Sequence, residues 1–392
     1  MRFFLLSPAN MATGGTELLH QFSKCLSECG IENYMIYPDR DGIHCPTPPT
    51  FEKYGVKYIS RYIDASDSVL VLAETQIHFI DECKKGTAMI WWLSVDNYFH
   101  AYRGRIREDN VDIFGLKEKK NVVHFVQSHY AKEFVNSYFS MDNCYFLMDY
   151  INDEITEYAL MNHKRYVRER ICLYNPKKGY EVLKPIIEAC KKDITWIPLI
   201  HMKPLEIAET MCKAMVYVDF GSHPGKDRIP REAAVCGCCV LTNQKGSAGY
   251  DEDVVIPEQC KIEDTSNVSV VLAKIYDLID NYDDRIEQYA TYRDIIRREK
   301  SEFIKDLQTA IQILKEKTEE NMIRIPAIDE GQCMQVLESI SNAATKIYEL
   351  SEDGKVAHSS DNLSGMIDSL LTIDFVLQRI REKVYAELID LV

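Results

Sequence analysis

The segment GSHPGKDRIPREAA, residues 221–234, places a cluster of charged side chains directly after an apolar run. Lys226 and Arg228 are cationic, and Pro230 suits the first turn of a helix. Backbone N–H groups at the start of such a helix attract an anion, as do the two cations. The carboxylate of Glu232 does not bind phosphate, but it can accept hydrogen bonds from sugar hydroxyls. The segment therefore predicts a nucleotide site, with the diphosphate on the cations and the ribose on Glu232. A solvated charged loop is the alternative.

A second cationic turn lies in LYNPKKGYEVL, residues 173–183, after an earlier apolar run. The proline and glycine of this segment predict a turn at the end of a strand, and Lys177 and Lys178 lie within it. In a parallel sheet, ligands bind at the carboxyl ends of the strands. This turn and residues 221–232 are therefore expected at the same edge. The cations then converge, and each charge-assisted hydrogen bond to phosphate contributes about 1.5–3 kcal/mol.

A pair of adjacent glycines, Gly14 and Gly15, follows the first apolar run of the chain. The segment has neither the Gly-x-Gly-x-x-Gly fingerprint nor the lysine of a P-loop. Two glycines before a helix nevertheless let backbone N–H groups approach a ligand closely. We therefore predict that Gly14 and Gly15 contact the same ligand, and a plain turn is the alternative.

One polar pair stands in WWLSVDNYFHAY, residues 91–102, which also follows an apolar run. Asp96 and His100 are the side chains of this segment that could contact an acceptor or receive a proton. The alternative for each is a surface or structurally satisfied group without a role in chemistry.

The elements that position these residues alternate between strands and helices. In the first half we expect strands at 2–6, 33–38, 68–73, 88–94 and 121–128, and helices at 16–29, 75–86 and 129–139. A polar linker is expected at 152–170. The second half then has strands at 169–175, 194–200, 215–221 and 239–243, with helices at 180–193, 204–214 and from 229. This pattern predicts an α/β protein with two Rossmann-like parallel sheets that face each other across a cleft.

The predicted domains are residues 1–155, residues 165–305 and a helical extension at 306–392. The last helix of the extension carries an apolar stripe with heptad-like spacing: Met366, Leu370, Ile373, Leu377, Ile380, Val384 and Leu391, interrupted by Glu387. Such a stripe must be buried. It packs on the body of the same chain or forms a homodimer seam.

The composition of the chain limits its expected partners and cellular location. The 392 residues carry a formal charge of -15, so the molecule as a whole repels nucleic acid and anionic membranes. The 13 cysteines are an odd number, without two Cys-x-x-Cys pairs at zinc-finger spacing, which favours reduced thiols in a cytosolic protein. The first apolar run is too short for a signal peptide, and no run of 18 apolar residues predicts a membrane span. We expect a cytoplasmic protein, free or peripheral at the inner membrane.

Taken together, these motifs resemble the retaining GT-B glycosyltransferases, in the large family that includes bacterial mannosyltransferases and sucrose synthases. The shared pieces are Gly14-Gly15, Lys178-Gly179 and the Glu-Ala-x-x-x-Gly segment at 232–237, and the resemblance covers about residues 1–305. Two positions depart from the family. Pro224 stands where the family has a first glutamate that contacts the donor sugar, with His223 or Asp227 as substitutes nearby. Tyr174 and Asn175 replace an arginine, for which Lys177 or Arg228 can substitute.

The resemblance implies sugar transfer from a nucleotide-diphosphate donor to a glycan, lipid-linked or protein acceptor, with retention of configuration, in surface polysaccharide biosynthesis. It implies no cofactor and no metal, since cations such as Lys178 and Arg228 meet the charge of the leaving diphosphate. The expected catalytic residues are Asp96, His100, Lys178 and Arg228. Two alternatives remain: a nucleotide-sugar-binding or scaffolding protein that has lost catalysis, motivated by Pro224, and a sugar-nucleotide epimerase or hydrolase of the same fold.

Overall fold

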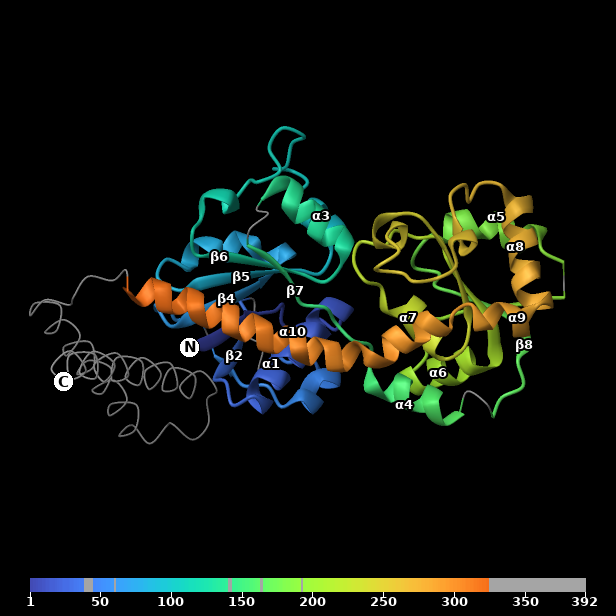
Figure 1. Cartoon of the computed structure of the whole chain (residues 1–392), viewed down its shortest axis with the longest axis horizontal. Coiled ribbons are helices and arrows are strands. Elements are labelled where there is room, and N and C mark those ends of the chain that lie inside the picture. Colours follow the sequence, from blue (N-terminus) through green and yellow to red (C-terminus); the bar gives the residue numbers. More distant parts are fainter. Residues whose placement is uncertain (39–44, 60, 140–142, 163–164, 192, 324–392) are drawn as a thin grey trace, which may run out of the picture. The chain divides into compact units, whose positions relative to one another are not determined.

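A computed structural model of the chain describes residues 1–38, 45–59, 61–139, 143–162, 165–191 and 193–323 (Figure 1). Residues 1–89, with the described residues from Ile313 onward, form one compact unit, and residues 90–312 form another. No helix in the described ranges is both long and apolar enough to cross a bilayer.

The first sheet has seven strands in the order β3-β2-β1-β4-β5-β6-β7. Its strands are β1 (Arg2–Leu6), β2 (Asn33–Ile36), β3 (Tyr58–Ile59), β4 (Ser68–Ala73), β5 (Thr87–Trp92), β6 (Val122–Val126) and β7 (Cys144–Phe146). Strand β1 pairs in parallel with both β2 and β4, and β6 pairs in parallel with β7. All five residues of β1 are buried, which explains why the strand is a continuous apolar run after Arg2.

The helices α1 (Gly14–Glu28), α2 (Val95–Ala101) and α3 (His129–Tyr138) follow strands of this sheet. Helix α1 begins at the predicted Gly-Gly pair, and a capping box fixes its start. Thr13 accepts a hydrogen bond from the backbone N–H of Thr16, and the Thr16 hydroxyl accepts one from the N–H of Thr13. Short helical segments follow at η1 (Pro49–Tyr54) and η3 (Leu116–Glu118), and a longer one at η2 (Glu74–Glu82).

The second sheet has five strands in the order β12-β11-β10-β8-β9. Its strands are β8 (Glu169–Tyr174), β9 (Thr195–Pro198), β10 (Ala214–Asp219), β11 (Cys239–Asn243) and β12 (Lys261–Ile262), and neighbouring strands pair in parallel. Its helices are α4 (Asp153–Asn162), α5 (Tyr180–Ala189), α6 (Pro204–Lys213), α7 (Arg228–Val235), α8 (Val268–Asp280), α9 (Tyr282–Glu287) and α10 (Ala290–Ile323), with short turns η4 (Gly246–Gly249) and η5 (Glu258–Cys260). Helices α5 and α8 lie side by side, as do α4 and α6 (Figure 1).

The two predicted parallel sheets are confirmed, with two local corrections. The expected α-helix at 75–86 is the 3₁₀ segment η2, which ends at Glu82. The expected linker at 152–170 is wrong in its first half, because residues Asp153–Asn162 form α4, which packs against α6 and buries Ile155 and Ala159. The polar composition of α4 concealed a narrow apolar face. Helix α10 ends the described part of the chain, so the apolar stripe from Met366 to Leu391 lies outside the described residues.

The core of the second sheet is rich in cysteine. Cys172, Cys212, Cys236, Cys238 and Cys239 are all buried there among aliphatic side chains. The cysteines of the described residues are free thiols. Burial raises the pKa of the Cys238 thiol to about 12, so the group packs as a small apolar side chain.

Candidate functional site

The two cationic turns predicted from the sequence meet at the carboxyl ends of β8 and β10, which are neighbours in the sheet. Gly179 has a φ of 67° and is the N-cap of α5. A Cβ atom on Gly179 would lie 2.5 Å from the carbonyl carbon of Phe220, and one on Gly221 would lie 2.7 Å from Cβ of Lys178. Only glycine allows this approach. The two turns therefore cross backbone against backbone, and Lys178 is carried to the loop that precedes α7.

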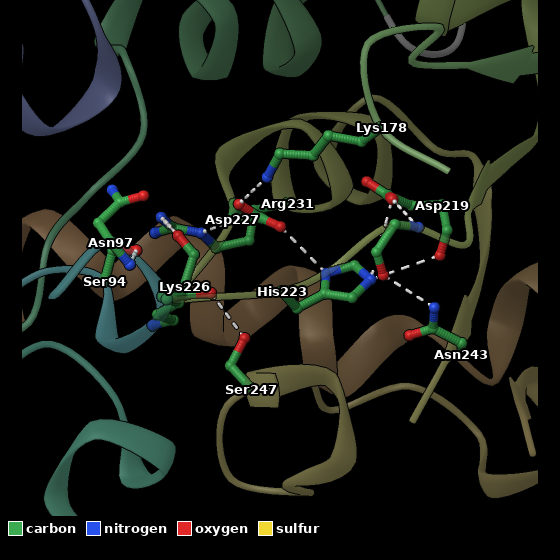
Figure 2. Close-up of polar contacts among 12 residues, drawn as sticks. Ser94, Asn97, Lys178, Asp219, His223, Lys226, Asp227, Arg231, Asn243 and Ser247 are labelled. Carbon is green, nitrogen blue, oxygen red and sulfur yellow. Dashed lines mark hydrogen bonds and ion pairs between the residues drawn. The ribbon is translucent and has the colours of Figure 1, made fainter. Parts of the chain in front are cut away.

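The loop between β10 and α7 is held by hydrogen bonds to its carbonyl oxygens (Figure 2). Asn243 donates its side-chain amide to the carbonyl of Gly221 at 2.8 Å. Ser247 donates its backbone N–H to His223 at 2.8 Å and its hydroxyl to Gly225 at 2.6 Å. The donors come from β11 and η4, so the loop is braced along its length.

The same loop also touches the residues that follow β5. The N–H of Val95 donates to the carbonyl of Pro224 at 2.9 Å. A Cβ atom on Gly225 would lie 2.0 Å from the carbonyl oxygen of Leu93, so this position also requires glycine. The start of α2, which carries Asp96, therefore lies beside the loop that carries Pro224. The site residues of both segments belong to the unit formed by residues 90–312.

A row of alternating charges crosses this edge of the second sheet (Figure 2). Lys178 Nζ lies 2.8 Å from Asp227 Oδ1, and Asp227 Oδ2 lies 3.1 Å from His223 Nδ1. His223 Nε2 on the other side of the ring lies 3.9 Å from Asp219 Oδ1. Asp219 in turn accepts hydrogen bonds from the Tyr217 hydroxyl and the Gly221 N–H. The imidazole thus stands between two carboxylates, one facing each ring nitrogen.

The protonation states follow from these contacts. Burial alone would lower the pKa of His223, but the Asp227 hydrogen bond and the charges of Asp219 and Asp227 outweigh it and raise the pKa. Burial would likewise raise the pKa of Asp227, but His223 and Lys178 together lower it. At Asp219 burial prevails, and the pKa is raised. The row therefore favours a charged imidazolium between the carboxylates.

The same three side chains offer the only clustered metal-ligand set found among the described residues. One ligand atom each from Asp219, His223 and Asp227 lies within 4.8 Å of the others. However, the two ring nitrogens of His223 face opposite carboxylates, and the Lys178 ammonium already lies on Asp227. A metal ion would have to compete with that ammonium. The geometry suits a shared proton better than a metal.

A second ionic network lies beneath the loop. Arg231 Nη2 contacts Asp149 Oδ2 at 2.7 Å, and Arg231 Nη1 contacts Glu299 Oε2 at 2.8 Å. Lys226 Nζ lies 2.9 Å from Glu299 Oε1. Burial would raise the pKa of Asp149, but the charges of Arg231, Lys226 and Arg228 lower it. Lys226, which the sequence analysis expects on a phosphate, is 7% exposed and is paired with this interior carboxylate instead.

The remaining cations and the acid surround the start of α7. Lys177 is exposed in the turn before α5. Arg228 is the first residue of α7, half-buried, and its Nε lies 4.0 Å from Asp149 Oδ2. Glu232 is buried and lies at the start of the second turn of α7, because α7 begins at Arg228, one residue earlier than predicted.

The other predicted residues lie on helices that follow strands of the first sheet. Asp96, in α2, is half-buried and accepts a hydrogen bond from the Tyr130 hydroxyl at 3.1 Å, whereas His100, in the last turn of α2, is exposed. Gly14 and Gly15 begin α1, in the other compact unit. Their place in the site stays a prediction.

Asp219 and the two ion networks were not predicted from the sequence. Asp219, His223 and Asp227 are spaced four residues apart, which is a detectable signal and would normally suggest one face of a helix. These residues do not lie on one helix, because Asp219 ends β10 and the other two lie in the loop that follows. Asp149 and Glu299 lie far from Arg231 in the sequence, so that only the fold pairs them.

Comparison with known proteins identifies the architecture. No protein-family model and no curated protein sequence matches the chain. Among solved structures, Anabaena HepE in complex with UDP-glucose is 9% identical, with 80% of this chain and 99% of that chain covered and a TM-score of 0.56. Sucrose-phosphate synthase from Thermosynechococcus elongatus is 12% identical, with 80% and 98% covered and a TM-score of 0.56. WaaG, a glycosyltransferase involved in lipopolysaccharide biosynthesis, is 11% identical, with 80% and 99% covered and a TM-score of 0.50.

Identities this low establish the fold alone. The similarity extends over nearly the whole length of each of these structures, and it includes both parallel sheets. The resemblance stated from the motifs is thus confirmed at the level of architecture: the chain has the GT-B fold of two parallel-sheet α/β domains.

Proposed function

We propose that the chain is a glycosyltransferase that takes its sugar from a nucleotide-diphosphate donor. The observation that carries the proposal is the crossing of the two turns at the carboxyl ends of β8 and β10, which brings Lys178 to the loop before α7. Lys178, Arg228 and the N–H groups at the start of α7 would hold the diphosphate. Glu232 would accept hydrogen bonds from the ribose. Lys177 stands at the rim of this donor site.

In the proposed reaction, a bond forms between the acceptor oxygen and the anomeric carbon while the bond from that carbon to the donor phosphate breaks. Negative charge grows on the leaving diphosphate, and Lys178, Arg228 and the start of α7 would meet it. Asp96 and His100 are the proposed acceptor-side residues that contact the acceptor or receive its proton. Retention of configuration and independence of metal are parts of the proposal that come from the GT-B resemblance.

The neighbouring structures suggest where to begin. HepE is in complex with UDP-glucose, which makes uridine donors the first choice for testing. WaaG acts in lipopolysaccharide biosynthesis, which favours an acceptor that is a glycan or lipid-linked sugar. We place the reaction in the cytoplasm, peripheral to the inner membrane where the acceptor is lipid-linked. The domain limits of 1–155 and 165–305 remain the proposed acceptor-side and donor-side domains.

A thermal-shift screen of the full chain against UDP-, GDP-, dTDP-, ADP- and CMP-sugars tests the donor class. A ligand present at 100 times its Kd should stabilise the fold by about 2.7 kcal/mol. The selected donor is then incubated with candidate acceptors, and nucleoside diphosphate release is measured. Release that requires the acceptor supports a transferase. Binding without turnover supports the scaffolding alternative, and release of free sugar or interconversion of donors without an acceptor supports the hydrolase or epimerase. A chain that no nucleotide sugar stabilises would contradict all three.

A further inference from the structure

The row formed by Lys178, Asp227, His223 and Asp219 has a property that donor binding alone does not require. We propose that Asp227 is an internal counterion that holds Lys178 until the donor diphosphate replaces it, and that His223 takes up a proton as this exchange occurs. The inference rests on the proposed function, because it concerns the same site. In the proposed exchange, Lys178 contacts the ligand, whereas Asp227 and His223 are positioning residues.

The exchange is possible because Lys178 is accessible while its partner is anchored. The Lys178 side chain is 33% exposed, so a phosphate oxygen can reach its ammonium. Asp227 is anchored on its other side, since its second carboxylate oxygen faces His223, whose side chain is 1% exposed. The Asp227 carbonyl also accepts a hydrogen bond from Arg231 Nε at 3.2 Å. Lys178 can therefore move from the carboxylate to a phosphate while Asp227 stays in place.

The exchange changes the charge that surrounds His223. The charged groups that face it are Asp219 at the end of β10, Asp227 before α7 and Lys178 from the turn before α5. The η4 segment reaches the backbone of His223, through the N–H of Ser247. The two carboxylates favour the imidazolium, whereas Lys178 opposes it. When Lys178 turns toward a diphosphate, its opposition weakens and a new anion arrives nearby.

Both changes act in the same direction, so ligand binding raises the pKa of His223 further. The protein takes up a proton in the pH range between the free and the bound pKa values. Because the pKa of His223 in the free protein already lies above its ordinary value of 6.5, the pH range of proton uptake lies above 6.5. The proton comes from the buffer, and no covalent step is involved.

Calorimetric titration tests the exchange directly. The full chain is titrated with whichever of UDP, GDP, dTDP and ADP binds best, in buffers of different ionisation enthalpy, at a series of pH values that rises from 6.5. The dependence of the binding enthalpy on the buffer gives the number of protons taken up. We expect uptake that passes through a maximum at a pH above 6.5. His223→Gln should still bind the nucleotide but should take up no proton.

Asp227→Asn provides the second arm, because it removes the competitor for Lys178. It should tighten nucleotide binding by up to about fivefold, as expected for the loss of a partly exposed ion pair. Asp280→Asn is the matched control. Asp280 pairs with Arg170 on the surface, so its loss reports the effect of one fewer negative charge without touching the row.

The outcomes separate the inference from the proposed function. Nucleotide binding without proton uptake in the wild-type chain overturns the inference alone. So does weaker binding by Asp227→Asn, because Asp227 would then position Lys178 for the ligand rather than compete with it. A chain that binds no nucleoside diphosphate at all overturns the proposed function and the inference together.

Discussion

Arg231 Nη2 lies 2.7 Å from Asp149 Oδ2, and both side chains are sealed from solvent, at 0% and 1% exposure. The guanidinium also reaches Glu299. The contact joins α7, the segment before α4 and the long helix α10, which are more than 60 residues apart along the chain. Charged groups buried in this way fix one arrangement of these segments, because any other arrangement would leave a charge without its partner.

The first prediction concerns Arg231. Arg231→Met should lower the free energy of unfolding by about 3–5 kcal/mol, because it removes a buried cation that pairs with two buried carboxylates. Among the described residues, Glu299 would keep only Lys226, and Asp149 only the more distant Arg228. Urea denaturation measures the effect. Arg170→Met is the control, since Arg170 pairs with Asp193 and Asp280 at the surface and should cost at most about 1 kcal/mol. Equal losses in the two variants would contradict the buried network.

The second prediction concerns pH and His223. The pKa of His223 is raised in the folded protein, so its stabilising contribution is complete below the unfolded value of about 6.5 and is lost as the pH rises through the folded value. The difference in unfolding free energy between the wild type and His223→Gln should therefore be largest below pH 6.5 and should shrink as the pH rises above that value. Chemical denaturation at several pH values checks the sign. A difference that grows with pH would mean that His223 is buried as a neutral ring.

The third prediction separates close approach from backbone strain. Gly179 and Gly115 have similar positive φ values of 67° and 62°. A Cβ atom on Gly179 would lie 2.5 Å from the backbone of Phe220, whereas one on Gly115 would meet nothing within 4 Å. Substitution by alanine costs roughly 1 kcal/mol at Gly115 for the φ alone. We expect Gly179→Ala to cost more and also to weaken nucleotide binding, because the two turns must move apart. Equal stability losses, with binding unchanged, would show that the crossing is not needed.

The fourth prediction concerns the proposed phosphate contacts. Lys178→Ala and Arg228→Ala should each weaken nucleoside-diphosphate binding by about 1.5–3 kcal/mol while the fold remains intact. Lys184→Ala is the control, since Lys184 lies exposed on α5 and pairs with Glu188. Calorimetry measures affinity, and far-UV circular dichroism checks the fold. Unchanged affinity in both variants would remove the assignment.

The fifth prediction concerns Glu232. If its carboxylate holds the ribose, Glu232→Gln should weaken nucleotide binding but leave pyrophosphate binding roughly unchanged. Competition experiments with both ligands make the comparison. A parallel loss for pyrophosphate would mean that Glu232 organises the loop before α7 instead.

The sequence was sufficient for the layout of the sheets and for the meeting of the two cationic turns. Apolar runs such as β1 and β10 are buried on both faces, and a run of that kind is visible without a structure. The sequence did not reveal the partner or the burial of each cation. Lys226 and Arg228 are two residues apart, yet Lys226 pairs in the interior and Arg228 lies half-buried at the helix start. Partners such as Glu299 are brought in by α10, and local sequence carries no information about so distant a contact.

The buried cysteines in the core of the second sheet can report how often this part of the protein opens to solvent. Alkylating reagents attack the thiolate, a form that burial suppresses at Cys172, Cys238 and Cys239. Cys29 and Cys45 are exposed and should be alkylated at once. Later alkylation at Cys172, Cys238 or Cys239 would then mark an excursion in which this sheet admits solvent. Mass spectrometry of the alkylated peptides over time would thus measure the rate of those excursions, and a bound donor should slow that rate.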